Sequence, residues 1–241
     1  DGSNDKTSEF IRKYYLSVIL ISHKKSIGYI ASRNKMLNLT TAIYCISLDD
    51  DSHIVSQDAL DKIKQFFELY PKSGVIAFRI FWGKTLPENL GHSLTNKRVK
   101  GFVGCGHVWR MKAWREIPNY PEWFVFYGEE QFASYQLFLN NWEVHYNPDI
   151  LVHHRVDVKG RKKDKDYKIR LRRSLRSGWY LYLLFYPWKL IPRRFLYTLY
   201  IQFKTKVFQG DVKALMGVLG AFADFIFTFP KLIYNRKSLT L

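Results

Sequence analysis

The feature that most constrains the fold of this chain is the alternation of short apolar runs with amphipathic segments along its first two thirds. The apolar runs expected as strands are residues 17–22, 41–48, 75–81, 142–146 and 150–152. The segments with helical periodicity are residues 6–14, 28–39, 57–69 and 131–139. Strands that alternate with helices in this way are typical of an α/β sheet with a parallel core.

Three adjacent carboxylates, Asp49, Asp50 and Asp51, follow the apolar run at 41–48. Neighbouring anions repel one another, so an ordered edge holds them only with a divalent cation, a ring of basic residues, or water around a loop. Ligands of open α/β sheets bind outside the carboxyl ends of strands, and this position favours a binding site. The alternative is a solvated acidic turn or a helix cap at Asp51 or Ser52.

The 241 residues carry a formal net charge of +17 and are 47% hydrophobic. This apolar content excludes a disordered chain and suffices for one sizeable core. The positive charge indicates an anionic partner, which is nucleic acid, an anionic lipid surface or a phosphorylated substrate. Cys45 and Cys105 form neither a disulfide framework nor a metal-binding spacing, which favours a reducing compartment.

Three later motifs are each compatible with a binding site and with a structural role. The glycine-rich turn at 101–107 allows close approach to a ligand, but a simple hairpin explains it better when it is taken alone. Glu129 and Glu130 begin a predicted helix, where the helix dipole favours carboxylates whatever their role. His153 and His154 follow the last apolar run, and such a pair is usually satisfied by the fold or exposed at the surface.

Six motifs occur in a fixed order. They are Asp-Gly-Ser-Asn-Asp-Lys-Thr at 1–7, Ala-Ser-Arg-Asn at 31–34, Leu-Asp-Asp-Asp at 48–51, Gly-Cys-Gly at 104–106, Tyr-Gly-Glu-Glu at 127–130 and Pro-Asp-Ile-Leu-Val-His-His at 148–154. Taken together they resemble family 2 glycosyltransferases of the GT-A fold, and most of all the branch of rhamnosyl- and galactofuranosyl-transferases. The resemblance covers about residues 1–155, and the ordered set is more specific than any single motif.

The resemblance implies a GT-A fold, which is a Rossmann-like α/β arrangement with a mixed sheet flanked by helices. It implies a catalytic domain over residues 1–157 that binds a nucleotide sugar, followed by a helical region over 158–241. In the family, a nucleotide-binding strand, a helix and a second strand precede the Asp-Gly-Ser motif. The catalytic domain is therefore expected to be incomplete at its N-terminus.

By the same resemblance, Asp49, Asp51 and His154 are the expected ligands of a Mg²⁺ or Mn²⁺ ion. Such an ion would neutralise the diphosphate that leaves as the bond to the sugar breaks. These ions prefer oxygen ligands shared between carboxylates and phosphates, and imidazole can join them on Mn²⁺. A bound ion would explain how a basic chain holds three adjacent carboxylates.

The resemblance also assigns the donor and acceptor sides of the site. The residues expected to bind the nucleotide sugar are Asp1, Arg33, Asn34, Asp49, Asp50, Gly104 and Gly106. Glu130 is the expected base that deprotonates the acceptor hydroxyl, and Glu129 is the supporting carboxylate. The family often has glycine where Met36 stands, and an acidic residue and an arginine where Phe132 and Gln136 stand. These departures leave open a degenerate transferase that acts as a membrane-bound scaffold.

The implied reaction is an inverting single displacement, in which the acceptor oxygen attacks the anomeric carbon opposite the diphosphate. The expected acceptor is a hydroxyl of a glycan or a lipid-linked molecule in cell-surface polysaccharide synthesis. The alternative from a different functional class is a non-enzymatic, basic protein that binds nucleic acid. Against it, the aromatic residues lie in apolar runs, and the acidic triplet would repel phosphates, so no nucleic-acid partner is expected.

From residue 159 onward, apolar and aromatic runs alternate with clusters of lysine and arginine. Each run is shorter than the roughly 20 residues that span a bilayer, so no membrane-spanning helix is expected. Basic flanks with interleaved tryptophan and tyrosine are typical of helices that lie in an anionic membrane surface. We therefore expect a peripheral membrane protein that binds the cytoplasmic face of the cell membrane. The alternative is that these helices pack on the catalytic domain or on a second copy of the chain.

Overall fold

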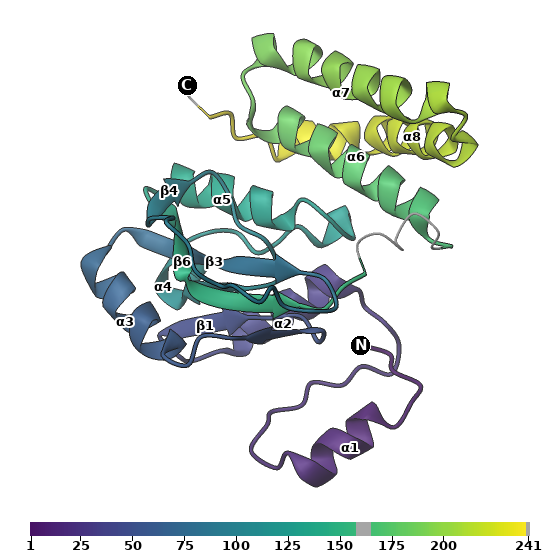
Figure 1. Cartoon of the computed structure of the whole chain (residues 1–241). Coiled ribbons are helices and arrows are strands. Elements are labelled where there is room, and N and C mark those ends of the chain that lie inside the picture. The colour runs from purple at the N-terminus through teal and green to yellow at the C-terminus, as the bar shows by residue number, and fades with distance from the viewer. Residues whose placement is uncertain (158–164, 240–241) are drawn as a thin grey trace.

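The computed structural model describes residues 1–157 and 165–239, and its centre is a six-stranded sheet with strand order β1-β5-β3-β6-β2, in which β4 also pairs with β6. The strands are β1 (Tyr44–Ser47), β2 (Ser52–Ile54), β3 (Ser73–Trp82), β4 (Lys97–Val99), β5 (His107–Arg110) and β6 (Glu143–His154). The helices of the N-terminal part are α1 (Thr7–Tyr14), α2 (Tyr29–Leu39), α3 (Ala59–Leu69), α4 (Met111–Arg115) and α5 (Glu129–Leu139). Helices α3 and α5 lie on opposite sides of the sheet (Figure 1).

The sheet is mixed, as the resemblance implies, and the parallel core expected from the alternation forms only in part. β3 and β6 run parallel, whereas β5 is antiparallel to both of its neighbours, β1 and β3. β2 and β4 run antiparallel to β6. Parallel neighbours need a crossover connection, usually a helix. The connection from β3 to β5, residues 83–106, contains β4 but no helix, so β5 returns antiparallel.

The strand expected at residues 17–22 does not form, and this prediction was wrong. The segment follows α1, and no strand of the described chain pairs with it. Val18 and Ile19 are more than half exposed, and α1 buries no residue and projects away from the sheet (Figure 1). A strand needs the backbone groups of a neighbour, so an apolar run without one stays irregular.

The other expected elements of the N-terminal part are confirmed to within a few residues, as α1, α2, α3, α5, β1 and β3. The two strand-like pieces at 142–146 and 150–152 form one continuous strand, β6. β2, β4, β5 and α4 were not predicted. β2 and β4 are only three residues long and carry polar side chains, and β5 and α4 are only four and five residues long.

Alternate residues of the central strands pack into two separate cores. Val75 and Trp109 belong to a core shared with α2 and α5, whereas Ile76 and Val108 belong to a core shared with α3. Successive side chains of a strand point to opposite faces of a sheet, so the two cores lie on opposite faces. Both faces are therefore covered, and the ends of the strands are left for a binding site.

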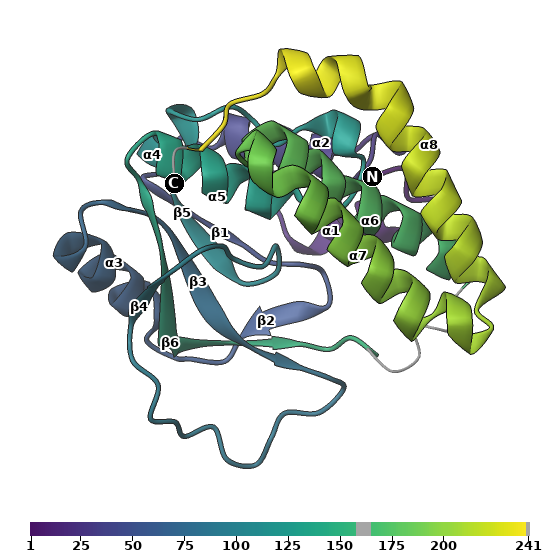
Figure 2. The ribbon, with the colours of Figure 1, turned by 90° about the horizontal axis from the view of Figure 1, so that it is seen from above.

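In the described part of the chain, three α-helices follow the sheet: α6 (Tyr167–Phe185), α7 (Ile191–Thr205) and α8 (Val212–Tyr234). The short 3-10 helices η3 (Trp188–Leu190) and η4 (Val207–Gln209) connect them. The α-helices lie above α5 (Figures 1 and 2). Tyr180, Leu184 and Phe185 of α6 are buried in the same core as Phe124 and Phe132. The core of the N-terminal part thus continues into the C-terminal helices through α6.

Helix α8 has 23 residues and is apolar enough to cross a membrane by length and composition. The prediction that every C-terminal apolar run is too short was therefore wrong for this helix. Asp224 in its middle does not interrupt it, because the carboxylate accepts hydrogen bonds from Arg172 at 2.7 Å and Arg176 at 3.1 Å. An acid paired in this way can lie within an apolar helix.

Candidate active site

The acidic turn and the histidine pair meet because β2 pairs with the end of β6. The antiparallel register sets Ser52 opposite His154 and His53 opposite His153. Asp51, which precedes β2, therefore lies beside His154, and its Oδ1 is 2.9 Å from Nε2 of the imidazole. Two of the three predicted metal ligands are thus in contact, although they are far apart in the sequence.

A tight turn holds the three carboxylates in an ordered arrangement. The hydroxyl of Ser52 donates to the carbonyl of Asp49 at 2.8 Å and accepts from its N–H at 2.9 Å, and the Ser52 N–H donates to the same carbonyl. This turn leaves Asp50 exposed and Asp49 only partly exposed. Asp49 and Asp51 both approach His154, whereas Asp50 is turned to solvent, so only two of the three carboxylates belong to the cluster.

Arg33 of α2 supplies the positive charge that faces Asp49. Its Nη2 is 2.5 Å from Oδ1 of Asp49 and 2.8 Å from the carbonyl of Leu48, and its Nη1 donates to the hydroxyl of Ser47. The guanidinium also lies over the ring of Tyr29, 5.1 Å from the ring centroid. Arg33 and Asp49, which were each expected to bind the nucleotide sugar, thus form an ion pair at the carboxyl end of β1.

One group of side chains in the described part of the chain has the composition of a metal site. Ligand atoms of Asp49, Cys105 and His154 lie within 4.8 Å of one another, and Asp51 touches His154. Nδ1 of His154 is buried and has no hydrogen-bond partner among the described residues. Two carboxylates and an imidazole suit Mg²⁺ or Mn²⁺. Burial raises the pKa of the Cys105 thiol, so Cys105 is the weakest ligand of the group.

Glu130 lies on the other side of this cluster, at the start of α5. Its carboxylate lies directly against the backbone of Gly104. A side chain at Gly104 would overlap Oε1 of Glu130 and come within 2.9 Å of the Tyr29 hydroxyl. Burial and the charge of Asp49 raise the pKa of Glu130, while the Gly104 N–H and Arg33 oppose the shift. The predicted base is therefore close to the predicted donor residues.

Glu129 is 3% exposed, and its Oε2 has no hydrogen-bond partner among the described residues. Burial and the charge of Glu130 raise the pKa of Glu129. A buried carboxyl group without partners favours its neutral form. Glu129 therefore keeps its proton at higher pH than an ordinary glutamic acid.

Two predicted donor residues, Asp1 and Gly106, have structural contacts in this fold. Asp1 accepts hydrogen bonds from the Ile27 and Gly28 N–H groups, both at 2.9 Å, next to the start of α2, and its contact with a nucleotide stays a prediction. Gly106 adopts a φ of +82° and connects β1 to β3 through hydrogen bonds of its own backbone.

Asn34 makes structural contacts within the protein, and its role in nucleotide binding stays a prediction. It is buried, its Nδ2 donates to the carbonyl of Tyr120 at 2.9 Å, and its Oδ1 accepts from the N–H of the same residue at 3.0 Å. Both ends of the amide are thus occupied. In this structure Asn34 joins α2 to the segment before α5 and does not face the cluster.

Three residues of the site were not predicted: Tyr29, Cys105 and His107. Tyr29 stands one helical turn before Arg33, and this spacing was a usable signal, because residues four apart share a helix face. Burial and the charge of Arg33 lower the pKa of His107 to about 3, so the imidazole is neutral. The Gly-Cys-Gly motif was a usable signal for Cys105, because Gly104 and Gly106 on either side of it were expected at the site. No sequence signal placed His107, since its position depends on how β5 enters the sheet.

The family profile described as Glycosyl transferase family 2 matches residues 1–145, which is more than half of the chain. The chain belongs to this family. Its predicted site residues lie in the matched region, except His154, which lies nine residues beyond it. A search of curated proteins finds no match.

Several solved structures share the fold of this family 2 chain. S. aureus TarS 1-349 in complex with UDP has a TM-score of 0.52 at 17% identity, over 74% of this chain and 54% of that one. GalNAc-T7 with UDP, GalNAc and Mn²⁺ has a TM-score of 0.60 at 11% identity, over 95% and 48%. The mannosyltransferase PcManGT from Pyrobaculum calidifontis, in complex with GDP-Man and Mn²⁺, has a TM-score of 0.54 at 12% identity, over 95% and 64%. This chain thus spans about half the length of the TarS 1-349 structure.

The buried Glu129 gives a first testable prediction. Its raised pKa means that the folded state binds this proton more tightly than the unfolded state, so the wild type loses stability as pH rises above about 4.3, the ordinary value of a glutamic acid. Glutamine cannot ionise, so Glu129→Gln should have a higher melting temperature than wild type at pH 8 and an equal one at pH 5. Each kcal/mol of unfolding free energy that is regained at pH 8 should raise the melting temperature by about 2–4 °C.

Thermal unfolding at both pH values measures this difference, with the exposed Glu88→Gln as the matched control. If the melting temperature of Glu129→Gln relative to wild type is the same at pH 5 and at pH 8, Glu129 ionises in the folded state without loss of stability.

Proposed function

We propose that this family 2 chain transfers a sugar from a nucleoside diphosphate donor to a hydroxyl group, with inversion at the anomeric carbon. The observation that carries this proposal is the gathering of Arg33, Asp49, Asp51 and His154 at the same edge of the sheet as Glu130. The ligands in the similar structures are UDP, GalNAc, GDP-Man and Mn²⁺, which supports the donor class.

The donor side of the reaction falls to the carboxylates and the imidazole. Asp49, Asp51 and His154 would hold a Mg²⁺ or Mn²⁺ ion, and the imidazole favours Mn²⁺. When bound, the ion would stabilise the charge that develops on the departing diphosphate. Arg33 adds a fixed positive charge beside Asp49, where it can also hold a phosphate oxygen.

The acceptor side falls to Glu130. The acceptor oxygen bonds to the anomeric carbon, the bond from that carbon to the diphosphate oxygen breaks, and Glu130 takes the hydroxyl proton. Burial and Asp49 raise the pKa of Glu130, which makes its carboxylate a stronger base than an exposed one. Glu129 stays protonated next to it, which limits the negative charge in the pocket.

We further propose that the sugar is of the rhamnosyl or galactofuranosyl type, and that the acceptor is a glycan or lipid-linked molecule of cell-surface polysaccharide synthesis. The order and spacing of the six motifs support this branch. The apolar C-terminal helices support an acceptor that is carried at a membrane.

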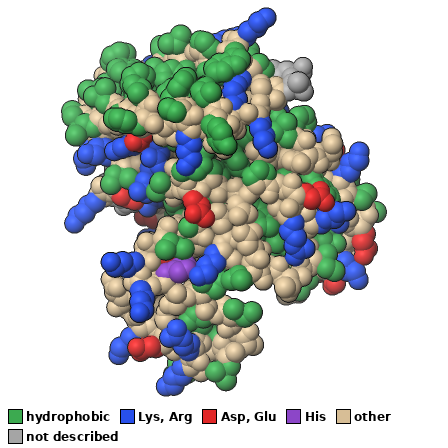
Figure 3. Space-filling model, turned by 180° about the vertical axis from the view of Figure 1, so that it is seen from behind, with side chains coloured by type: hydrophobic (Ala, Val, Ile, Leu, Met, Phe, Trp, Pro, Cys, Tyr) green, Lys and Arg blue, Asp and Glu red, His purple; other side chains and the backbone are tan. Residues whose placement is uncertain are grey.

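We also propose that α7 and α8 bind the cytoplasmic face of the membrane without crossing it. Hydrophobic side chains gather on these helices, with lysines and arginines nearby (Figure 3). The exposed apolar residues include Leu196, Tyr197, Tyr200, Phe208, Met216, Leu219, Phe222, Ile226, Phe227 and Phe229. Because Asp224 ties α8 to α6 and α6 packs into the core, α8 is held along the protein surface. This arrangement favours binding in the interface.

Nucleotide binding tests the donor site directly. We expect that one of UDP, GDP and dTDP binds only in the presence of Mn²⁺, because phosphate and carboxylates share the ion. Removal of a metal ligand by Asp51→Ala should weaken this binding by at least roughly tenfold. Asp58→Ala, an exposed carboxylate at the start of α3, is the control and should bind like wild type.

Calorimetric titration measures both effects. If no nucleotide binds either to this chain or to one extended upstream of Asp1, the transferase proposal fails and the scaffold alternative gains support. Salt-sensitive binding of an oligonucleotide without nucleotide binding would favour the nucleic-acid alternative.

Glu130→Gln tests the base. Glutamine keeps the size of the side chain but cannot take a proton, so turnover should fall by roughly 100- to 10,000-fold, while nucleotide binding is retained. The wild-type rate should rise with pH over a range above that of an ordinary carboxylate, because only ionised Glu130 accepts the proton and its pKa is raised. Release of nucleoside diphosphate from the bound donor measures turnover, with Glu88→Gln as control. Unchanged turnover in Glu130→Gln would remove Glu130 as the base.

Sedimentation with lipid vesicles tests the membrane proposal. We expect binding to phosphatidylglycerol vesicles that weakens as salt rises, since each lysine or arginine near an anionic surface contributes about 1 kcal/mol. The double variant Leu219→Asp/Ile226→Asp changes two exposed positions of α8 and should release the protein. Leu60→Asp, an exposed leucine of α3, is the matched control and should bind as wild type does. Equal binding by both variants would contradict this membrane surface.

A further inference from the structure

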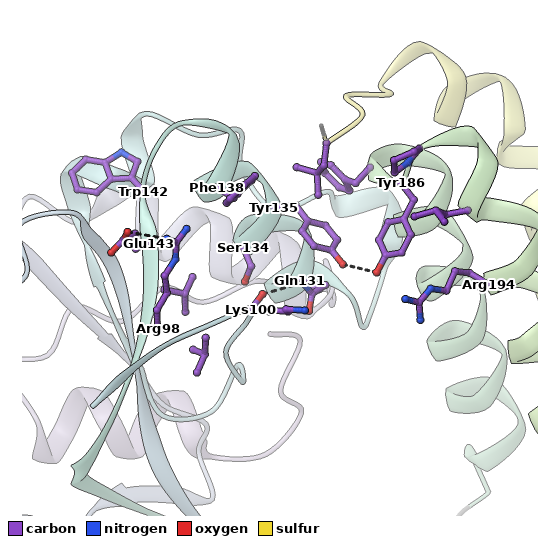
Figure 4. Close-up of a pocket in the computed structure, with 16 residues that line it drawn as sticks. Arg98, Lys100, Gln131, Ser134, Tyr135, Phe138, Trp142, Glu143, Tyr186 and Arg194 are labelled. Atoms are coloured by element: carbon purple, nitrogen blue, oxygen red, sulfur yellow. Dashed lines mark hydrogen bonds and ion pairs between the residues drawn. The ribbon is translucent and has the colours of Figure 1, made fainter. Parts of the chain in front are cut away.

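A cavity of about 770 Å³ lies between α5, the β4–β6 edge of the sheet and the junction of α6 with α7 (Figure 4). This is within the roughly 300–1,000 Å³ typical of ligand sites. Its walls are mostly aromatic and aliphatic, and they include Tyr135, Phe138, Trp142, Phe185, Tyr186 and Leu190. None of these residues takes part in the donor site, so the cavity is a separate feature.

Positive charge accompanies these apolar walls. Lys100 and Arg194 line the cavity and are both exposed, and neither forms an ion pair in the described part of the chain. A third basic residue, Arg98, is already paired with Glu143 at 3.1 Å. Arg194 also lies over the ring of Tyr186, 5.9 Å from the ring centroid. Two cations without a carboxylate partner beside apolar walls fit a ligand that joins an anion to a hydrocarbon chain.

The two tyrosines provide further polar groups between the walls. The hydroxyl groups of Tyr135 and Tyr186 lie 3.2 Å apart and point toward each other across the cavity (Figure 4). Only one hydrogen is needed between them, so the other hydroxyl hydrogen is free to meet an acceptor such as a phosphate oxygen.

The cavity is directly connected to the proposed base. Gln131, which lines it, is the residue after Glu130, and its Nε2 donates to the carbonyl of Lys100 at 3.2 Å. The chain then runs from Lys100 to Gly104, whose backbone lies against the carboxylate of Glu130. A ligand in the cavity therefore contacts both segments that position the base.

We propose that this cavity binds the lipid-phosphate end of the acceptor, with the hydrocarbon chain against the aromatic walls and the phosphate between Lys100 and Arg194. The inference rests on the proposed transferase function and assigns a substrate class to it. A membrane phospholipid has the same chemistry, but it carries two chains, and the cavity is assigned to a single chain.

Calorimetry with soluble probes tests this assignment. Farnesyl phosphate carries one chain and one phosphate, farnesol lacks the phosphate, and dihexanoyl phosphatidylglycerol represents a bilayer lipid. We expect farnesyl phosphate to bind wild type more tightly than either of the others. Arg194→Ala should weaken the binding of farnesyl phosphate by roughly tenfold, because one charged hydrogen bond is lost. The binding of farnesol should not change.

Arg193→Ala is the matched control, because Arg193 is exposed on the same turn of α7 but does not line the cavity. Leu190→Trp fills the cavity and should abolish binding of both prenyl compounds. Thermal unfolding checks that each variant is folded.

Two results would overturn the proposal. One is farnesyl phosphate binding that Leu190→Trp leaves intact or that Arg193→Ala weakens as much as Arg194→Ala does. The other is equal or tighter binding of dihexanoyl phosphatidylglycerol, which would assign the cavity to a bilayer lipid. Nucleotide titration of the same samples separates the two proposals: retained nucleotide binding with no prenyl phosphate binding overturns only the acceptor cavity, whereas loss of nucleotide binding from both wild type and the chain extended upstream of Asp1 overturns the transferase function.

Discussion

The pairing of β2 with the last residues of β6 is the interaction on which the candidate site depends. It brings the acidic turn against a histidine from a distant part of the chain. Ser52 closes that turn through hydrogen bonds to both backbone groups of Asp49. Without this strand pair, the three carboxylates would form an ordinary solvated loop. Backbone hydrogen bonds, rather than any attraction among the acids, therefore hold the charged residues in place.

Arg33 balances the two acidic halves of the site. It binds Asp49 directly, and its charge also lowers the pKa of Glu129 and Glu130 against the larger effect of burial. One cation therefore acts on both the donor side and the acceptor side. The stacking of its guanidinium on Tyr29 fixes its orientation.

Much of the fold could be predicted because helix periodicity and buried strands are local signals. The segment at 17–22 has the composition of a strand but no partner, and pairing is a property of the tertiary structure. The motif order indicated Asp49, Asp51, Glu130 and His154 together, and they do lie close to one another. A motif does not determine which way a side chain points. Asn34 was therefore assigned to the nucleotide but faces Tyr120.

The burial of α6 in the main core has a consequence for protein engineering. Removal of the apolar C-terminal helices is the usual route to a better-behaved protein, but here it would strip Tyr180, Leu184 and Phe185 from a core that they share with Phe124 and Phe132. A shortened protein would expose the retained rings of Phe124 and Phe132 to solvent, and we expect it to aggregate. Solubility is better sought by polar replacements on the outer side of α7 and α8, which leave α6 in place.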